Sequence, residues 1–241
     1  MGCGASSSAQ TAPAPAAKPQ NNMAPTAPPK MKLTYFDIRG RAEPIRLILE
    51  AGGVKYEFNG ISQEEWKNLK PMAITGGLPI LEINDKPLGE SLAIGRFVAR
   101  QHDMTGADSF DAACCDMIVE QVNEIFFVKL APVAFMPDEE KLPALKKLVE
   151  EYMPAKFAIL QKFADKNNNG CFVGNKITWA DIYFFSIFDL MNAHLPTEAC
   201  EMIKGKFIAP CPSFQRIIHT VKSNPGIAAY LKNRELPVTD A

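Results

Sequence analysis

Strand signals are confined to residues 31–88 of this sequence, and this division limits the folds that the chain can adopt. The β-branched, aromatic and alternating patterns typical of strands occur in four segments, residues 31–37, 54–58, 78–83 and 87–88. Helical patterns separate them, with one helix predicted over 43–52 and another over 91–102. The order β-α-β followed by β-β-α predicts a mixed sheet with helices packed on it.

Beyond residue 106 the apolar residues recur at helical spacing, and the strand signals end. Three helices are predicted there, over residues 108–135, 137–166 and 182–191. Thr178 and Asp181 form a capping box ahead of the last of them. We therefore expect a thioredoxin-like α/β domain of residues 31–105, followed by an all-helical domain of residues 106–241.

The first thirty residues differ in composition from the rest of the chain. They are rich in proline and alanine and carry few charges, so we expect residues 1–30 to be a disordered tether. The start Met-Gly-Cys-Gly-Ala-Ser fits N-myristoylation at Gly2, and Cys3 is the candidate site of a second, palmitoyl chain. Acylation would hold a cytoplasmic protein at the cytoplasmic face of a membrane. A tail without lipid that promotes solubility is the alternative.

The overall composition excludes several classes of function. The chain is 47% hydrophobic and 22% charged with a formal net charge of −1, which is ordinary for a globular protein and gives no reason to expect a nucleic-acid partner. His102, His194 and His219 are scattered without the spacing of metal ligands, and no phosphate-binding glycine loop occurs. We expect neither a metal nor a bound cofactor.

The positions of the cysteines restrict the chemistry further. A thioredoxin-like domain that exchanges disulfides has a cysteine near its first strand–helix turn, but residues 31–113 contain none. The adjacent pair Cys114 and Cys115 lies on a predicted helix, where packing is the simpler interpretation. If this domain acts on a thiol, the thiol must arrive with a substrate.

Three stretches of the chain resemble signature segments of the cytosolic glutathione transferases. They are LTYFDIRGRAEPIRLIL, GGLPILEINDKPLGESLAIGRFVA and FVGNKITWADIYFFSIF. The start Tyr-Phe-x-x-Arg-Gly-Arg-Ala-Glu resembles the sigma class, which also contains the hematopoietic prostaglandin D synthases. The resemblance runs from about residue 32 to residue 232 and implies the fold of that family, with glutathione as a co-substrate.

The resemblance assigns the thiol-activating group to Tyr35, with Arg41 as a second catalytic residue. A hydroxyl that donates a hydrogen bond to a thiolate lowers the pKa of the thiol. A thiol of ordinary pKa is about 3% ionised at pH 7, and lowering that pKa by ~2 units would give roughly 75% thiolate, the form that reacts. The simpler alternative for Tyr35 is an aromatic residue that covers the core at the end of a strand.

The remaining glutathione contacts are also implied by the resemblance. Leu78 and Pro79 match the cis-proline turn that pairs with the cysteinyl backbone of glutathione, and Gly76 and Gly77 precede it. The γ-glutamyl and glycyl ends would be held by Glu90, Ser91, Trp66 and Lys70. An anchored loop with a solvated lysine is the alternative for the last two. Sigma-class relatives usually have glutamine where this chain has Glu90.

Two further assignments concern the helical domain. In relatives an acidic residue of the first long helix reaches the glutathione of a dimer partner, and Glu124 is the match here. The acidic stripe of that helix is otherwise interpreted as a solvated or dimer-facing surface. The acceptor cavity is expected beside Phe36 and Ile38, with walls from the helical domain at Phe126, Phe127, Phe135 and Met136.

The sequence therefore predicts a dimeric glutathione transferase that conjugates glutathione thiolate to small hydrophobic electrophiles, such as products of lipid peroxidation. The alternatives are a relative without enzymatic activity, either a ligand carrier or a crystallin-like structural protein. A prostaglandin isomerase is a lesser alternative, because that relative uses a tryptophan of its fourth helix and this chain has tryptophan only at positions 66 and 179.

Overall fold

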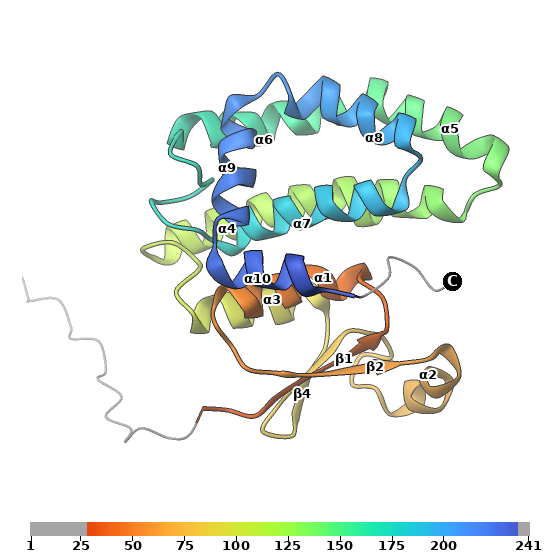
Figure 1. The fold of residues 1–241 in the computed structure, drawn as a ribbon, viewed down its shortest axis with the longest axis vertical. Helices are drawn as coiled ribbons and strands as arrows, with labels where there is room; N and C mark the ends of the chain where they lie inside the picture. Colours follow the sequence, from red (N-terminus) through yellow and green to blue (C-terminus); the bar gives the residue numbers. More distant parts are fainter. Residues whose placement is uncertain (1–27, 236–241) are drawn as a thin grey trace, which may run out of the picture.

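The computed structural model describes residues 28–235, with side chains for all of these except residues 134 and 192–194. The candidate acylation sites Gly2 and Cys3 lie outside the described residues. A four-stranded sheet with helices on one face forms the lower half of the molecule in Figure 1, and a layer of helices lies above it. The predicted fold class, a thioredoxin-like domain followed by an all-helical domain, is confirmed.

The sheet has the strand order β2-β1-β3-β4. Its strands are β1 (Met31–Phe36), β2 (Glu57–Ile61), β3 (Ile80–Ile83) and β4 (Lys86–Leu88). β1 pairs in parallel with β2 and antiparallel with β3, and the register places Thr34 opposite Ile80. The sheet is therefore mixed, as predicted. The peptide bond between Leu78 and Pro79 is cis, at the point where the chain enters β3.

The second strand begins three residues later than predicted, because the chain is still closing the preceding helix. Gly53 has a φ of +63°, and the Val54 N–H donates to the carbonyl of Leu49 at 3.0 Å. The residues after helix α1 (Glu43–Ala51) thus donate to carbonyls at its C-terminal end. The sequence pattern assigns Val54 to the strand. β2 therefore occupies Glu57–Ile61 instead of residues 54–58.

The segment around Trp66 is helical, between the second and third strands. Helix α2 (Gln63–Leu69) begins with a capping box, in which the Glu65 N–H donates to Ser62 Oγ at 3.2 Å and the Ser62 N–H donates to Glu65 Oε2 at 2.7 Å. The sequence Ser-x-x-Glu could have revealed this start. A short 3-10 turn, η2 (Lys70–Met72), follows directly.

Helices form the rest of the described chain, as predicted. They are α3 (Ser91–Gln101), α4 (Ser109–Asn123), α5 (Asp138–Lys147), α6 (Met153–Asn167), α7 (Trp179–His194), α8 (Thr197–Ile203), α9 (Pro212–Lys222) and α10 (Pro225–Asn233). Shorter turns interrupt them, including the π-helical η3 (Glu124–Leu130), η5 (Leu148–Tyr152) and η6 (Lys204–Ile208) and the 3-10 turn η4 (Ala131–Phe135). The predicted helices 108–135 and 137–166 are thus each divided.

α10 returns the end of the chain to the first domain. In Figure 1 it lies beside α1, between the sheet and the helical layer. α7 passes through the centre of the helical domain, where Trp179 is fully buried and its backbone N–H donates to the Met104 carbonyl at 2.9 Å. Gly95 of α3 faces the Trp179 ring, and a side chain there would contact Ile48 as well. The two domains therefore share one continuous core.

A buried carboxylate fixes the start of α7. Asp181 is fully buried and accepts hydrogen bonds from the Thr178 hydroxyl and N–H, both at 2.7 Å, and from the Phe172 N–H at 2.6 Å. The two backbone donors are orphan groups that would otherwise be buried without an acceptor. The capping box predicted from the sequence is confirmed, and it also holds the preceding loop.

Replacing Asp181 by asparagine should destabilise the protein by about 1–3 kcal/mol, because an amide has one acceptor oxygen where the carboxylate has two. Urea unfolding of the two proteins would measure the change. Asp85→Asn is the control, because Asp85 lies in the exposed β3–β4 turn at a φ of +65°, which asparagine tolerates. Equal unfolding free energies for Asp181→Asn and the wild type would contradict this account.

Candidate active site

Tyr35 ends the buried part of β1, and its hydroxyl meets the turn that follows. The side chain is 7% exposed, and its Oη accepts a hydrogen bond from the Arg41 N–H at 3.0 Å. The turn reaches this position through Gly40, which has a φ of +42°. A Cβ atom at Gly40 would lie 2.5 Å from Tyr35 Oη, so the approach requires glycine. The phenol is therefore held by backbone atoms that are local in sequence.

Arg41 extends from this turn toward the helical domain. Its side chain is exposed, and the guanidinium carbon lies 4.4 Å from the centre of the Phe127 ring of η3. A cation over an aromatic face is attracted by the ring quadrupole. The contact spans the two domains, and Arg41 and Tyr35 line the same cavity.

A cavity of about 480 Å³ lies between the turn and the helical domain. Its wall is apolar apart from the Tyr35 hydroxyl, the Arg41 guanidinium and backbone atoms. The lining residues are Tyr35, Ile38, Gly40, Arg41, Phe126, Phe127, Leu130, Ala131, Pro132, Phe135 and Leu195. Such a cavity suits a small hydrophobic molecule that reacts beside a hydroxyl and a cation.

Four of the six residues predicted to form the walls of this cavity line it in the structure. Ile38, Phe126, Phe127 and Phe135 line it, whereas Phe36 and Met136 do not. The side chain of Phe36 points to the opposite face of the sheet, where its ring meets the edge of Trp66 with the ring centres 6.4 Å apart. The contribution of Leu130, Pro132 and Leu195 was missed, because it depends on the turns η3 and η4 and on the end of α7.

The strand register brings Leu78 and Pro79 next to Tyr35. Since Ile80 is opposite Thr34 in an antiparallel pair, the residues just before β3 lie beside the end of β1. Gly76, with a φ of +65°, and Gly77 form the exposed turn that leads into this segment. The Leu78 backbone therefore lies at the same edge of the sheet as the Tyr35 side chain.

Glu90 and Ser91 follow β4 at the start of α3. Glu90 is exposed and has a φ of 65° and a ψ of 113°, a strained conformation for a residue with a side chain. No side chain caps the helix that begins at Ser91. The N-terminal end of α3 is thus a positive dipole end without a side-chain cap, which favours an anionic ligand.

Trp66 and Lys70 lie on α2 and η2, beyond the end of β2. Trp66 is half-buried and lines a separate hollow of about 290 Å³ together with Thr34 and Leu78, on the other face of the sheet from the Tyr35 cavity. Lys70 is exposed. The structure therefore brings Trp66 close to Leu78 and does not bring it into the cavity of Tyr35.

Glu124 is the first residue of η3, and its carboxylate is bound within its own chain. It accepts hydrogen bonds from Tyr152 Oη at 2.6 Å and from Lys156 Nζ at 2.5 Å. These two donors, Lys156 first, hold the pKa of Glu124 below its ordinary value. A role toward a dimer partner would have to be shared with these internal contacts.

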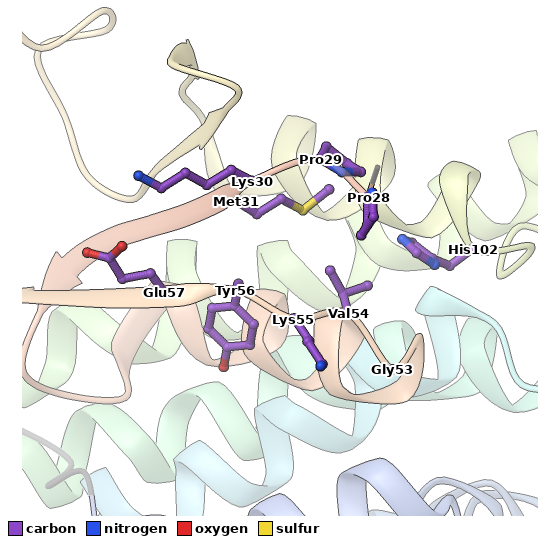
Figure 2. A pocket seen from close by; sticks show the side chains of 10 residues that line it. All are labelled: Pro28, Pro29, Lys30, Met31, Gly53, Val54, Lys55, Tyr56, Glu57 and His102. Atoms are coloured by element: carbon purple, nitrogen blue, oxygen red, sulfur yellow. The ribbon is translucent and has the colours of Figure 1, made fainter. Parts of the chain in front are cut away.

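Other features of the described residues lack this combination of groups. A second cavity, of about 620 Å³, lies near the start of β1 and is lined by Pro28, Val54, Tyr56 and His102 among others, but not by Tyr35. Figure 2 shows its lining side chains. Burial raises the pKa values of the Cys115 and Cys171 thiols to about 12, so neither is a ready nucleophile. Within residues 28–235, no group of three or more His, Cys, Asp and Glu side chains could hold a metal ion, and no helix could span a membrane.

The chain belongs to the glutathione S-transferase family. Residues 31–100 match the glutathione S-transferase N-terminal domain, and residues 126–234 match the C-terminal domain of the same family. These matches cover the sheet, the turn of Tyr35 and the helices that complete its cavity.

Its relatives include enzymes with different names. A glutathione S-transferase of Anopheles gambiae is 33% identical over 216 residues, which cover 88% of this chain and 99% of that protein. A hematopoietic prostaglandin D synthase of Gallus gallus is 31% identical and covers 86% of this chain and 97% of its own length. The solved structure of a sigma class glutathione S-transferase from Fasciola hepatica superposes with a TM-score of 0.76 at 26% identity, over 88% of this chain and 99% of that one.

Gly40→Ala should lower glutathione-dependent activity by about tenfold or more, because the new methyl group would displace the Tyr35 hydroxyl and a 1 Å shift at a reacting group has effects of this size. The control is Gly174→Ala. Gly174 also has a positive φ, +68°, but an added Cβ there meets no atom within 4 Å. Both variants bear similar backbone strain, so comparable activity in the two would contradict the assigned contact.

Proposed function

We propose that this protein is a sigma-class glutathione transferase that joins the thiolate of glutathione to small hydrophobic electrophiles. The observation that carries the proposal is the Tyr35 hydroxyl, which is held by the Arg41 N–H at the wall of an apolar cavity. A hydroxyl has one proton to donate and also accepts hydrogen bonds, so the Arg41 N–H can orient the oxygen while its proton is directed to a ligand sulfur. The wall beyond it would receive the electrophile.

In the proposed reaction, the thiol of bound glutathione loses its proton to solvent, and Tyr35 stabilises the thiolate that forms. The sulfur electron pair then forms a bond to the electrophilic carbon. With an aromatic halide the carbon–halogen bond breaks and halide leaves, whereas an enal takes up a proton at the carbon next to its carbonyl. The positive charge of Arg41 would favour both the thiolate and the anionic adduct.

Glutathione itself would lie along the end of the sheet that carries the residues predicted to contact it. The Leu78 backbone would pair with the cysteinyl backbone beside Pro79, at the position that the register places next to Tyr35. The start of α3 at Glu90 and Ser91 would bind the charged γ-glutamyl end. Trp66 and Lys70, with the turn at Gly76 and Gly77, would hold the glycyl end.

The carrier and isomerase alternatives have less support. A ligand carrier requires an apolar cavity, but it does not require a hydroxyl and a cation in the wall of that cavity. Trp179 is fully buried and Trp66 lies on the other face of the sheet, so neither gives the cavity an indole of the kind that prostaglandin D synthase uses. We therefore rank conjugation first.

Tyr35→Phe should lower the rate of conjugation to a chlorinated dinitrobenzene by about 25-fold at pH 7, which is the loss expected when the thiolate fraction falls from roughly 75% to about 3%. The deficit should shrink as pH rises toward the pKa of free glutathione, because the thiolate then forms without help. A pH series of kcat/KM for both proteins measures this.

Tyr56→Phe is the matched control for that experiment. Tyr56 donates its hydroxyl to Glu50 at 3.2 Å, and Figure 2 shows the hydroxyl pointing away from Pro28 and Met31, toward the helices. This variant should retain the wild-type pH profile. Equal rates for Tyr35→Phe and the wild type at every pH would exclude thiol activation by Tyr35 and favour the carrier alternative.

We also propose that the protein is a homodimer. Phe110 and Met117, two turns apart on α4, are 74% and 42% exposed, and Met72 and Ile74, after α2, are 77% and 57% exposed. Large exposed apolar patches on soluble proteins mark sites of protein–protein interaction. The face of α4 and the segment after α2 would form the interface.

Sedimentation velocity should show the wild type as a dimer and Met72→Asp as a monomer, because a charge buried without a partner weakens an apolar interface. Ile159→Asp is the control, since Ile159 of α6 is 39% exposed but lies on a different helix from the proposed interface. A monomeric wild type would contradict the proposal, as would equal dissociation of the two variants.

A further inference from the structure

Behind the turn that carries Arg41, a buried guanidinium holds the backbone. Arg46 of α1 is 1% exposed, and its two terminal nitrogens donate to the carbonyls of Ile38 and Arg39 at 3.0 Å each. These carbonyls belong to the same turn whose Arg41 N–H reaches Tyr35 Oη. Arg46 therefore fixes the backbone donor that orients the phenol, although it does not line the cavity.

Arg46 is in turn held by the carboxylate of Glu43, whose other partners come from α10 and the residue that follows it. Glu43 is fully buried and accepts from Arg46 Nη1 at 3.1 Å, from Tyr230 Oη at 2.9 Å and from Arg234 Nη1 at 2.6 Å. A buried carboxylate is tolerated only with such partners. Tyr230 lies on α10 and Arg234 directly follows it, so residues close to the C-terminus complete a site at the start of α1.

Arg234 makes a second link to the same turn. Its guanidinium binds both oxygens of Asp189 on α7, at 2.7 and 2.9 Å, and Asp189 Oδ2 lies 3.7 Å from Arg39 Nη1. Burial opposes the charge of Arg234, but the hydrogen bonds and charges of Asp189 and Glu43 more than offset it, so the pKa of Arg234 is raised. Arg234 is thus a permanent cation that shares Asp189 with the residue two positions before Arg41.

We propose that Arg234 is a positioning residue for the thiol-activating turn. Without it, Glu43 would have Arg46 as its only cation within the cluster described above, and Asp189 would be left to draw Arg39 toward α7. Both changes pull on the backbone between Ile38 and Arg41. The Arg41 N–H would then orient the Tyr35 hydroxyl less well, and bound glutathione would ionise less readily. This inference rests on the proposed function of Tyr35.

The test is a titration of glutathione bound to the full-length protein, followed by the ultraviolet absorbance of the thiolate, in the wild type and in Arg234→Ala. We expect the apparent pKa of the bound thiol to rise by about half a unit to one unit in the variant. Conjugation should fall by about twofold to fivefold near pH 6.5, where the wild-type thiol is about half ionised, and by less near pH 9. The dissociation constant of glutathione should change by no more than about twofold.

Three further variants separate positioning from general stability. Arg234→Lys retains the charge, so the thiol pKa should rise less than in Arg234→Ala. Asp189→Asn weakens the same link from α7, so it should also raise the thiol pKa above the wild-type value. Lys232→Ala removes an exposed cation from the last turn of α10 and should leave the thiol pKa unchanged. Thermal unfolding is measured for each variant alongside the titration.

The outcomes distinguish the two proposals. If the wild type lowers the pKa of the bound thiol and Arg234→Ala and Asp189→Asn lower it by the same amount as the wild type, the positioning role is overturned. This holds even if both variants unfold at a lower temperature. A wild type that leaves the thiol pKa at its free value would overturn the proposed function of Tyr35 and this inference together. A raised pKa in Lys232→Ala of the same size as in Arg234→Ala would assign the effect to net charge and would also overturn the positioning role.

Discussion

The hydrogen bond from the Arg41 N–H to the Tyr35 hydroxyl is the contact on which the rest of the site depends. It joins the end of β1 to the turn that precedes α1, so the phenol is positioned between two elements whose apolar side chains belong to the core. Gly40 makes this approach possible because any larger residue would occupy the space of the hydroxyl. A reactive group supported in this way needs little reorganisation when a ligand arrives.

The cavity beside this hydroxyl is built by both domains, and each supplies what the other lacks. The sheet domain contributes the hydroxyl and the cation, whereas the helical domain contributes aromatic and aliphatic wall from η3 and η4. Arg41 over the Phe127 ring connects the two halves. Variation in the helical wall could therefore change which molecule the cavity accepts without disturbing the Tyr35 hydroxyl.

Local patterns in the sequence were sufficient for the parts of the fold that local forces decide. The strand that contains Tyr35 and the capping box at Asp181 were both predicted, because alternation and capping are short-range. The π-helical turn η3 was not, since a single extra residue in a helix leaves no period to detect. The link from Arg234 to Glu43 joins residues 191 positions apart, and no pattern in one sequence indicates such a contact. The predicted glutathione residues came from resemblance to a family, and their roles stay predictions.

The return of α10 to the first domain has a consequence for how the protein matures. A chain emerging from the ribosome exposes the whole sheet domain well before residues 230–234 are made, and domains tend to fold in the order of synthesis. During that interval Glu43 lacks both Tyr230 and Arg234, although Arg46 is already present. The turn beside Tyr35 would be completed only when the last helix docks. A truncated translation product would then contain Tyr35 and Arg41 without the final arrangement of the turn between them.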